Sequence, residues 1–144
     1  MADLAQILIE ESEGVRLTAY RDSLGKWTVG VGHLLDQSRG WDGYTITQAQ
    51  AETLLQADMG SSRSYAGVFP NYYSMNEVRQ AVCVSMCFQL GSKPLHWPNF
   101  MSALKAQDYS AASAAGLDSL WAQQTPKRAQ REMAMLQSGV WVGA

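Results

Sequence analysis

The sequence contains only two cysteines, Cys83 and Cys87, among its 144 residues. A domain held together by disulfides needs a wider framework of cysteines, so the class of small disulfide-rich secreted domains is excluded. The two residues lie four positions apart in a stretch that is typical of a helix, and therefore share one helical face. We interpret them as small buried thiols of a protein made in a reducing cytoplasm. A disulfide or a metal pair is the alternative.

An excess of charge of either sign is also missing. Lysine and arginine together number 11, and aspartate and glutamate number 13, which gives a formal net charge of −2. A nucleic-acid-binding surface needs a strong excess of basic residues, so we expect no nucleic-acid partner. A protein of this net charge that acts on an anionic polymer needs a local basic patch to attract that polymer.

The N-terminal segment lacks a basic stretch followed by an apolar run. It contains Asp3, Glu10, Glu11 and Glu13 instead, so we expect neither a signal peptide nor insertion into a membrane. If the substrate lies outside the membrane, something else must carry the protein to it. The sequence also lacks a cluster of residues with metal-ligand spacing.

What is present is ordinary globular composition, with 47% hydrophobic and 17% charged residues, which argues against disorder. The length suffices for one compact domain or for two lobes that share a connecting element. Asp3 and Gln6 resemble a capping box and Gly14 supplies a stop signal. A first helix is therefore predicted from about residue 4 to about residue 13.

The stretch after this helix has the pattern of a short β-hairpin. Between Leu17 and Leu35, glycines punctuate aromatic and β-branched residues, and the segment Asp22–Gly25 has the composition of a turn. A third short strand is predicted near Tyr44–Ile46. The polar, glycine-containing residues between 36 and 43 are predicted to form a loop.

Helical signals dominate from residue 47 onward, and the whole pattern predicts an α+β protein with six or seven helices. Two capping signatures mark helix starts, two prolines occupy first helical positions, and two glycines mark helix ends. In chain order these signals are Thr47 with Gln50, Ser74 with Glu77, Gly91, Pro98, Thr125 with Pro126, and Gly139.

Three side chains near the start of the chain suggest hydrolysis of a glycoside. Glu13 ends the first predicted helix, where the helix dipole disfavours a negative charge and so favours the protonated form that a general acid needs. Asp22 opens the hairpin turn, and Thr28 lies on the returning strand. Glycoside hydrolysis uses one carboxylic acid and one carboxylate on opposite sides of the sugar. The alternative is a solvated helix residue at Glu13 and an ordinary turn residue at Asp22.

Arg128 lies in the first turn of the helix that follows Thr125 and Pro126, where the helix dipole disfavours a cation. An acidic partner across a cleft would explain this position. Because Lys127 and Arg131 are close in sequence, a solvated basic patch is the alternative explanation.

The run Glu13–His33 combines Glu-Gly, Tyr-x-Asp, a turn glycine and Thr-x-Gly-x-Gly-His at fixed spacing. With these features it closely resembles the phage lysozymes of glycoside hydrolase family 24. Val78–Gly91, which ends in Phe-Gln-Leu-Gly, and Trp121–Ala129, which contains Gln-Thr-Pro-Lys-Arg-Ala, resemble the same family in the same order. The resemblance covers nearly the whole chain.

This resemblance implies a lysozyme-like α+β fold of one domain. A small N-terminal β-hairpin lobe would span about 14–47 and a long connecting helix about 48–64. A larger helical lobe would comprise 65–144 together with the N-terminal helix.

The resemblance also implies a role for each matching residue. Glu13 would protonate the glycosidic oxygen, Asp22 would orient and activate the attacking water, and the Thr28 hydroxyl would help to hold that water. The implied reaction is hydrolysis, with inversion, of the β-1,4 bond between N-acetylmuramic acid and N-acetylglucosamine. Arg128 would pair with the acid Glu13.

Four further positions match the family outside the catalytic set. Gln89 and Phe88 would line the sugar cleft, and His33 would form a structural ion pair with Asp58. The resemblance implies that the protein needs no metal or organic cofactor. The expected partner is bacterial peptidoglycan, and the protein is expected to be a monomer. It would remain in the host cytoplasm until a separate holin-like protein allows it to reach the wall, for cell lysis or for wall penetration by a phage.

Two alternatives keep this fold and change the function. A lytic transglycosylase would use Glu13 on the same substrate but would need no carboxylate to activate water, so an essential Asp22 would exclude it. A non-catalytic cell-wall binding module would need no intact set of catalytic residues.

The tryptophans divide into two groups. Trp121 and Trp141 recur at helical spacing with apolar residues and are predicted to lie in the core. Trp27 and Trp41, in the hairpin region, are candidates for contact with sugars in the cleft. His96 is interpreted as a surface residue.

Overall fold

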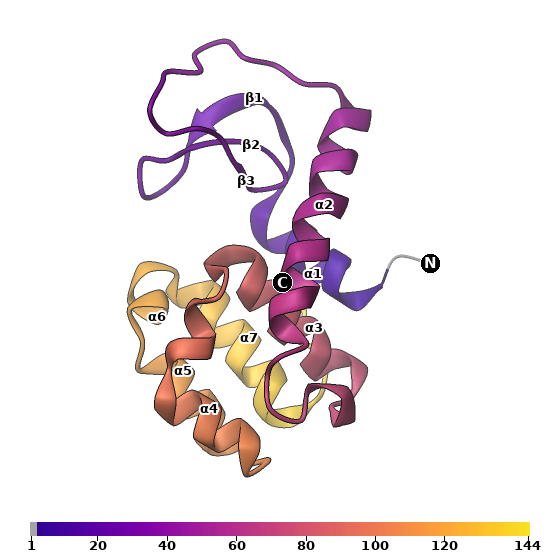
Figure 1. The fold of residues 1–144 in the computed structure, drawn as a ribbon, viewed down its shortest axis with the longest axis vertical. Helices are drawn as coiled ribbons and strands as arrows, with labels where there is room; N and C mark the ends of the chain where they lie inside the picture. The colour runs from indigo at the N-terminus through magenta and orange to yellow at the C-terminus, as the bar shows by residue number, and fades with distance from the viewer. Residues whose placement is uncertain (1–2) are drawn as a thin grey trace.

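The computed structural model describes residues 3–144. Figure 1 shows a small β-sheet at one end, a bundle of helices at the other, and one long helix that runs between them. The α+β fold class predicted from the sequence is therefore confirmed. In chain order the elements are α1 Leu4–Glu13, β1 Arg16–Arg21, β2 Trp27–Gly30, β3 His33–Leu34, α2 Gln48–Ala66, the 3-10 turn Tyr72–Ser74, α3 Glu77–Leu90, the 3-10 turn Lys93–His96, α4 Pro98–Lys105, α5 Tyr109–Leu117, α6 Leu120–Gln124 and α7 Pro126–Ser138.

Helix α1 has the bounds that the sequence predicted. The Asp3 side chain caps it by accepting from the backbone N–H of Gln6, and Gly14 ends it at a positive φ of 68°. Only glycine adopts such a backbone conformation without strain, so the chain turns directly from α1 into β1. The last residue of the helix, Glu13, is thereby held at the boundary between the helices and the sheet.

The sheet is antiparallel with the order β1-β2-β3. Strands β1 and β2 form the predicted hairpin, with Tyr20 opposite Thr28. The predicted third strand was wrong in its place, because β2 pairs next with the two-residue strand β3. The segment around Thr45 forms only an isolated bridge to Thr18 on the outer side of β1, where one short contact is too little for a strand.

Helix α2 links the sheet to the helical bundle (Figure 1). A complete capping box between Thr47 and Gln50 starts it, as the sequence predicted. Its first turns cover the sheet, where Ala51 packs with Val29 and Ile46 in a small apolar cluster. Its later turns pack against α3 in the main core of the molecule.

The main core surrounds α3, a helix whose residues from Ala81 to Cys87 are all buried. The predicted start of this helix at Ser74 with Glu77 was wrong. Ser74 belongs to the preceding 3-10 turn, and Asn76 provides the cap by accepting from the N–H of Arg79. Gly91 ends the helix as predicted.

Both cysteines and two of the tryptophans behave as the sequence indicated. Cys83 and Cys87 are free buried thiols on α3, and burial raises the pKa of the Cys87 thiol to about 12. Trp121 is buried, and Trp141 packs against the same core while partly exposed. Within residues 3–144 no helix combines the length and apolar character that are needed to cross a membrane.

Candidate active site

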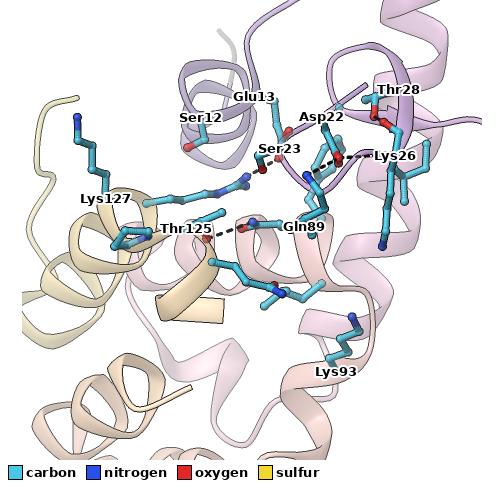
Figure 2. Close-up of a pocket in the computed structure, with 18 of the residues that line it drawn as sticks. Ser12, Glu13, Asp22, Ser23, Lys26, Thr28, Gln89, Lys93, Thr125 and Lys127 are labelled. Carbon is cyan, nitrogen blue, oxygen red and sulfur yellow. Dashed lines mark hydrogen bonds and ion pairs between the residues drawn. The ribbon is translucent and has the colours of Figure 1, made fainter. Parts of the chain in front are cut away.

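A cleft of about 540 Å³ lies where the sheet faces the helices, and Figure 2 shows the side chains that line it. Most of them come from the end of α1, from the β1–β2 hairpin, from the end of α3 and from the start of α7. The lining residues include Glu13, Asp22, Thr28, Gly32, Phe88, Gln89 and Arg128, together with Lys26, Lys93 and Lys127. Segments far apart in the sequence thus meet at one groove.

Glu13 stands at the helical side of this cleft. Its side chain is 20% exposed, and its Oε1 atom accepts a hydrogen bond from Nη1 of Arg128. Arg128 lies in the first turn of α7, where the helix dipole disfavours a cation. Glu13 is the acidic partner that compensates the charge of Arg128 at this position. The pairing joins the end of α1 to the start of α7.

Arg128 has a second acidic partner that the sequence reasoning missed. Glu132, one turn further along α7, accepts from Nε of Arg128 at 2.9 Å through its Oε2 atom. Ser85 on α3 donates from its hydroxyl to the same oxygen at 2.9 Å and accepts from Nη2 of Arg128 at 3.0 Å. The arginine is therefore fixed between three helices.

Burial and charge act in opposite directions in this network. Burial lowers the pKa of Arg128, but Glu132 and Glu13 outweigh it and the pKa is raised, so the guanidinium keeps its charge. Burial raises the pKa of Glu132 above its usual range, and the positive charge of Arg128 opposes this shift. The ion pair with Arg128 therefore provides the compensation that a buried carboxylate needs.

Asp22 lines the cleft from the β1–β2 hairpin and is held there by its own turn. Its Oδ1 atom accepts from the backbone N–H groups of Leu24 at 2.9 Å and Lys26 at 2.8 Å. The backbone of Asp22 also pairs with Lys26 across the hairpin. These bonds fix the carboxylate while leaving its Oδ2 atom without a hydrogen-bond partner among the described residues. That oxygen is free to accept from a molecule in the cleft.

Thr28 is buried at 2% exposure, yet it lines the cleft close to the hairpin turn. Its hydroxyl donates to the carbonyl oxygen of Lys26 at 2.9 Å. Because its single hydrogen is used in this way, the oxygen of Thr28 can act only as an acceptor toward the cleft.

Gln89 and Phe88, at the end of α3, line the same cleft. The Gln89 amide is oriented from both ends, since its oxygen accepts from Nε1 of Trp121 at 2.7 Å and its nitrogen donates to the Thr125 hydroxyl at 3.3 Å. Thr125 was predicted to cap α7, and this was wrong. Its hydroxyl bonds to the carbonyl of Trp121 and to Gln89, and makes no capping bond.

His33 and Asp58 form the ion pair that the resemblance implied, with Nδ1 and Oδ2 2.7 Å apart. They lie outside the main cleft, in a smaller hollow of about 220 Å³ between the sheet, α2 and α3. The hydrogen bond that His33 donates to the Asp58 carboxylate raises the pKa of His33 against the opposing effect of burial. The pair connects β3 to α2.

Trp27 and Trp41 do not contribute to the cleft, so their prediction as sugar contacts was wrong. Trp27 is buried at 6% exposure beneath the guanidinium of Arg21. Trp41 packs edge-to-face against Tyr44 and under Arg39 in the loop after the sheet. The alternation of residues in a short hairpin did not reveal which face of the strand points into the core. His96 is exposed, as predicted.

Gly32 is a further residue of the site whose role the sequence reasoning missed. It lies at a positive φ of 63°, and a Cβ placed on it would come within 2.5 Å of Oε2 of Glu13. The signal was present in the sequence as the second glycine of Gly-x-Gly-His. Glycine at this position gives the Glu13 carboxyl the space that it occupies.

Lys26, Lys93 and Lys127 stand around the edge of the cleft (Figure 2), and all three are exposed. The cleft is therefore locally basic in a protein whose net charge is −2. Among residues 3–144 no group of three or more histidine, cysteine, aspartate or glutamate side chains is arranged to hold a metal ion.

Comparison with known proteins gives a family match over most of the chain. The model of the family described as "Phage lysozyme" matches residues 10–135. Among individual relatives, the endolysin of Acyrthosiphon pisum secondary endosymbiont phage 1 is 32% identical, over 75% of this chain and 71% of its own length. The endolysin of Salmonella phage P22 is 30% identical, over 78% of this chain and 77% of its own.

A larger relative is the pre-baseplate central spike protein Gp5 of Enterobacteria phage T4, which is 32% identical over 92% of this chain. The match covers only 27% of that protein, so the chain spans about a quarter of its length. Similarity to this chain thus occurs both in proteins of comparable size and within a much longer virion component.

Proposed function

The chain belongs to the phage lysozyme family, and on that basis we propose that it is a muramidase. It hydrolyses the β-1,4 bond between N-acetylmuramic acid and N-acetylglucosamine in bacterial peptidoglycan, with inversion at the anomeric carbon. The observation that carries the proposal is the cleft itself, because the side chains of Glu13, Asp22 and Thr28 all line it.

Glu13 acts as the general acid. Its proton passes to the glycosidic oxygen as the bond from that oxygen to the anomeric carbon breaks. Arg128 lies against the carboxyl and stabilises the anion that Glu13 becomes once it has given up its proton.

Asp22 acts as the general base toward water. A water molecule in the cleft would donate one hydrogen to Oδ2 of Asp22 and the other to the Thr28 oxygen, whose own hydrogen is already given to Lys26. Such a water keeps a lone pair for attack on the anomeric carbon. Its proton passes to Asp22 as the new carbon–oxygen bond forms, which balances the proton given up by Glu13.

The surroundings of the cleft suit an anionic glycan. Peptidoglycan carries free carboxylates on its peptide stems, and Lys26, Lys93 and Lys127 provide the local basic patch that attracts a polymer of that charge. Gln89 and Phe88 are proposed as contacts to the sugars. The Gln89 amide is held from both ends, so it can present a fixed orientation to a substrate.

The test is digestion of purified peptidoglycan with mass analysis of the products, for wild type, Glu13→Gln and Asp22→Asn. We expect reducing-end muramic acid products from the wild type and a loss of about a hundredfold to ten-thousandfold in each variant, the range for a general acid or base. Asp36→Asn is the matched control, because Asp36 also accepts from backbone in a turn but lies outside the cleft. Proton NMR identifies which anomer of the product forms first, and so shows whether the reaction inverts the configuration at the anomeric carbon.

Two other outcomes would point to the alternative functions. Anhydro-muramic acid products, with Asp22→Asn still active, would identify a lytic transglycosylase. A folded wild type that binds peptidoglycan without any product would identify a binding module.

The biological role that we propose is peptidoglycan degradation for a phage. Two of the relatives are named endolysins, which supports lysis of the host cell, and one is a spike protein, which supports wall penetration. In the lysis role the protein is a monomer that stays in the host cytoplasm until a separate holin-like protein releases it. Expression with and without such a partner tests this, with culture lysis as the readout.

A further inference from the structure

Glu132 is a buried carboxylate that takes no direct part in the proposed reaction. Its side chain has an exposure of 0%, and its Oε1 atom is buried without a hydrogen-bond partner among the described residues. An isolated buried carboxylate is strongly disfavoured unless a cation compensates it. The cation here is Arg128, which is also the partner of the proposed acid.

Every nitrogen of the Arg128 guanidinium has a defined partner. Nε donates to Glu132 at 2.9 Å, Nη2 donates to the Ser85 hydroxyl at 3.0 Å, and Nη1 donates to Glu13. The guanidinium is rigid and planar, so fixing two of its edges determines the direction of the third. The buried contacts thus aim Nη1 at the carboxyl of Glu13.

We propose that Glu132 is a positioning residue for the acid, because it holds Arg128 against Glu13 and takes up part of the guanidinium charge. This proposal rests on the proposed function, in which Glu13 is the general acid. Two carboxylates face one cation, so ionisation of both leaves a net negative charge in a mostly buried site. Glu132 therefore competes with Glu13 for the charge of Arg128.

The charge balance of this network is set by Arg128, Glu13 and Glu132, because the other nearby groups are neutral, interact more weakly or lie on the cleft side. Cys83 on α3 faces Glu132, and burial raises the pKa of its thiol, which is therefore neutral. Arg131 contributes a weaker attraction to Glu132 and forms its own ion pair with Glu11. On the cleft side the groups near Glu13 are Tyr20, Asp22 and the lysines at positions 26, 93 and 127.

The test is the pH dependence of peptidoglycan hydrolysis by Glu132→Gln. Glutamine keeps the size of the side chain and an acceptor for Arg128, but it removes the charge. All of the guanidinium charge then acts on Glu13 and favours its ionised form. We expect the basic limb of the kcat profile to move by about one pH unit to lower pH, with kcat in the acidic range within about twofold of wild type.

Glu11→Gln is the matched control. Glu11 and Arg131 bridge the same two helices, α1 and α7, as Glu13 and Arg128 do, but their pair lies outside the cleft. This variant removes one negative charge at a similar place in the fold, and its pH profile should coincide with that of the wild type. A basic limb that does not move in folded Glu132→Gln, or that moves equally in Glu11→Gln, would overturn the proposal.

Ser85→Ala separates orientation from charge, and it remains informative if Glu132→Gln fails to fold. It removes a hydroxyl that touches both Arg128 and Glu132 and leaves every charge in place. We expect kcat to fall about threefold to tenfold with KM and the basic limb unchanged, since a misdirected guanidinium stabilises the Glu13 anion less well. An unchanged kcat would contradict the positioning role. A wild type without muramic acid products refutes the proposed function instead.

Discussion

Glu13 and Asp22 face the same cleft, but the two sides of that cleft hold them by different means. On the helical side, Glu13 contacts Arg128, which is held by the fully buried Glu132 and by Ser85. On the sheet side, Asp22 is held by backbone N–H groups of its own exposed turn. One carboxyl therefore depends on packing between three helices, and the other depends on the five residues of its own turn, Asp22 to Lys26.

This difference follows the two chemical tasks that we propose. A general acid becomes an anion as the leaving oxygen takes its proton, and a fixed cation in a partly buried site stabilises that anion. A carboxylate that activates water must accept from solvent, which an exposed hairpin turn allows. We infer that changes to the helical side alter stability and catalysis together, whereas changes to the sheet side act mainly on catalysis.

The largest effect should come from removing the central cation of the helical side. Arg128→Met leaves the buried carboxylate of Glu132 without its partner, which costs about 3–5 kcal/mol in the free energy of unfolding. Urea unfolding monitored by tryptophan fluorescence measures this loss. The control is Arg131→Met on the same helix, whose partner Glu11 is 39% exposed, and there we expect a loss of about 1 kcal/mol. Equal losses of stability in the two variants would show that the buried pair contributes no more than the exposed pair, which would contradict the prediction.

The next effect concerns the space beside the acid. In Gly32→Ala the added methyl group would meet Oε2 of Glu13 at 2.5 Å, at a backbone φ of 63° that disfavours alanine. We expect a loss of about 1–3 kcal/mol in stability from the backbone strain. Displacement of Glu13 should also lower kcat by about a hundredfold.

Gly40→Ala provides the comparison for that substitution. Gly40 lies in the loop after the sheet, with open space around its Cα and no positive φ. Its variant should match the wild type in both unfolding and activity. Full activity in a folded Gly32→Ala protein would show that Glu13 has more freedom than the contacts indicate.

The sheet side of the cleft was easier to predict from the sequence than the helical side. The turn at Asp22 and Gly25 and the caps at Asp3 and Thr47 depend on residues within a few positions of each other, and their chemistry is local. The Thr125 hydroxyl has the right position in the sequence for a helix cap, but in the fold it accepts a hydrogen bond from the Gln89 amide instead.

Glu132 marks the limit of that reasoning. Glutamate is a residue type that is mostly exposed, and Glu132 directly follows Arg131, so the residue types alone favour a solvated helix face. Its burial depends on Ser85, which lies 47 residues earlier on another helix. The position of Arg128 against a helix dipole did indicate an acidic partner, but a single chain cannot reveal that two carboxylates share it. The short strand β3 was missed for a similar reason, since two residues carry no detectable periodicity.

The smallest expected effect concerns the link between the sheet and α2. The Asp58 carboxylate raises the pKa of His33 above its ordinary value of 6.5, so the folded protein holds the proton more tightly than the unfolded chain does. The stabilisation is therefore fully present below pH 6.5 and is lost as the pH rises through the raised pKa. The two side chains are 27% and 32% exposed, which limits the contribution to about 1 kcal/mol.

Thermal unfolding of wild type and Asp58→Asn at pH 5.5 and pH 8.5 measures this contribution. We expect the variant to unfold about 3 °C below the wild type at pH 5.5 and at nearly the same temperature at pH 8.5. His96→Gln is the control, because His96 is exposed and has no acidic partner among the described residues. A difference that persists at pH 8.5 would mean that Asp58 stabilises the junction through packing. The sheet would then be tied to the helices by contacts as independent of pH as those in the main core.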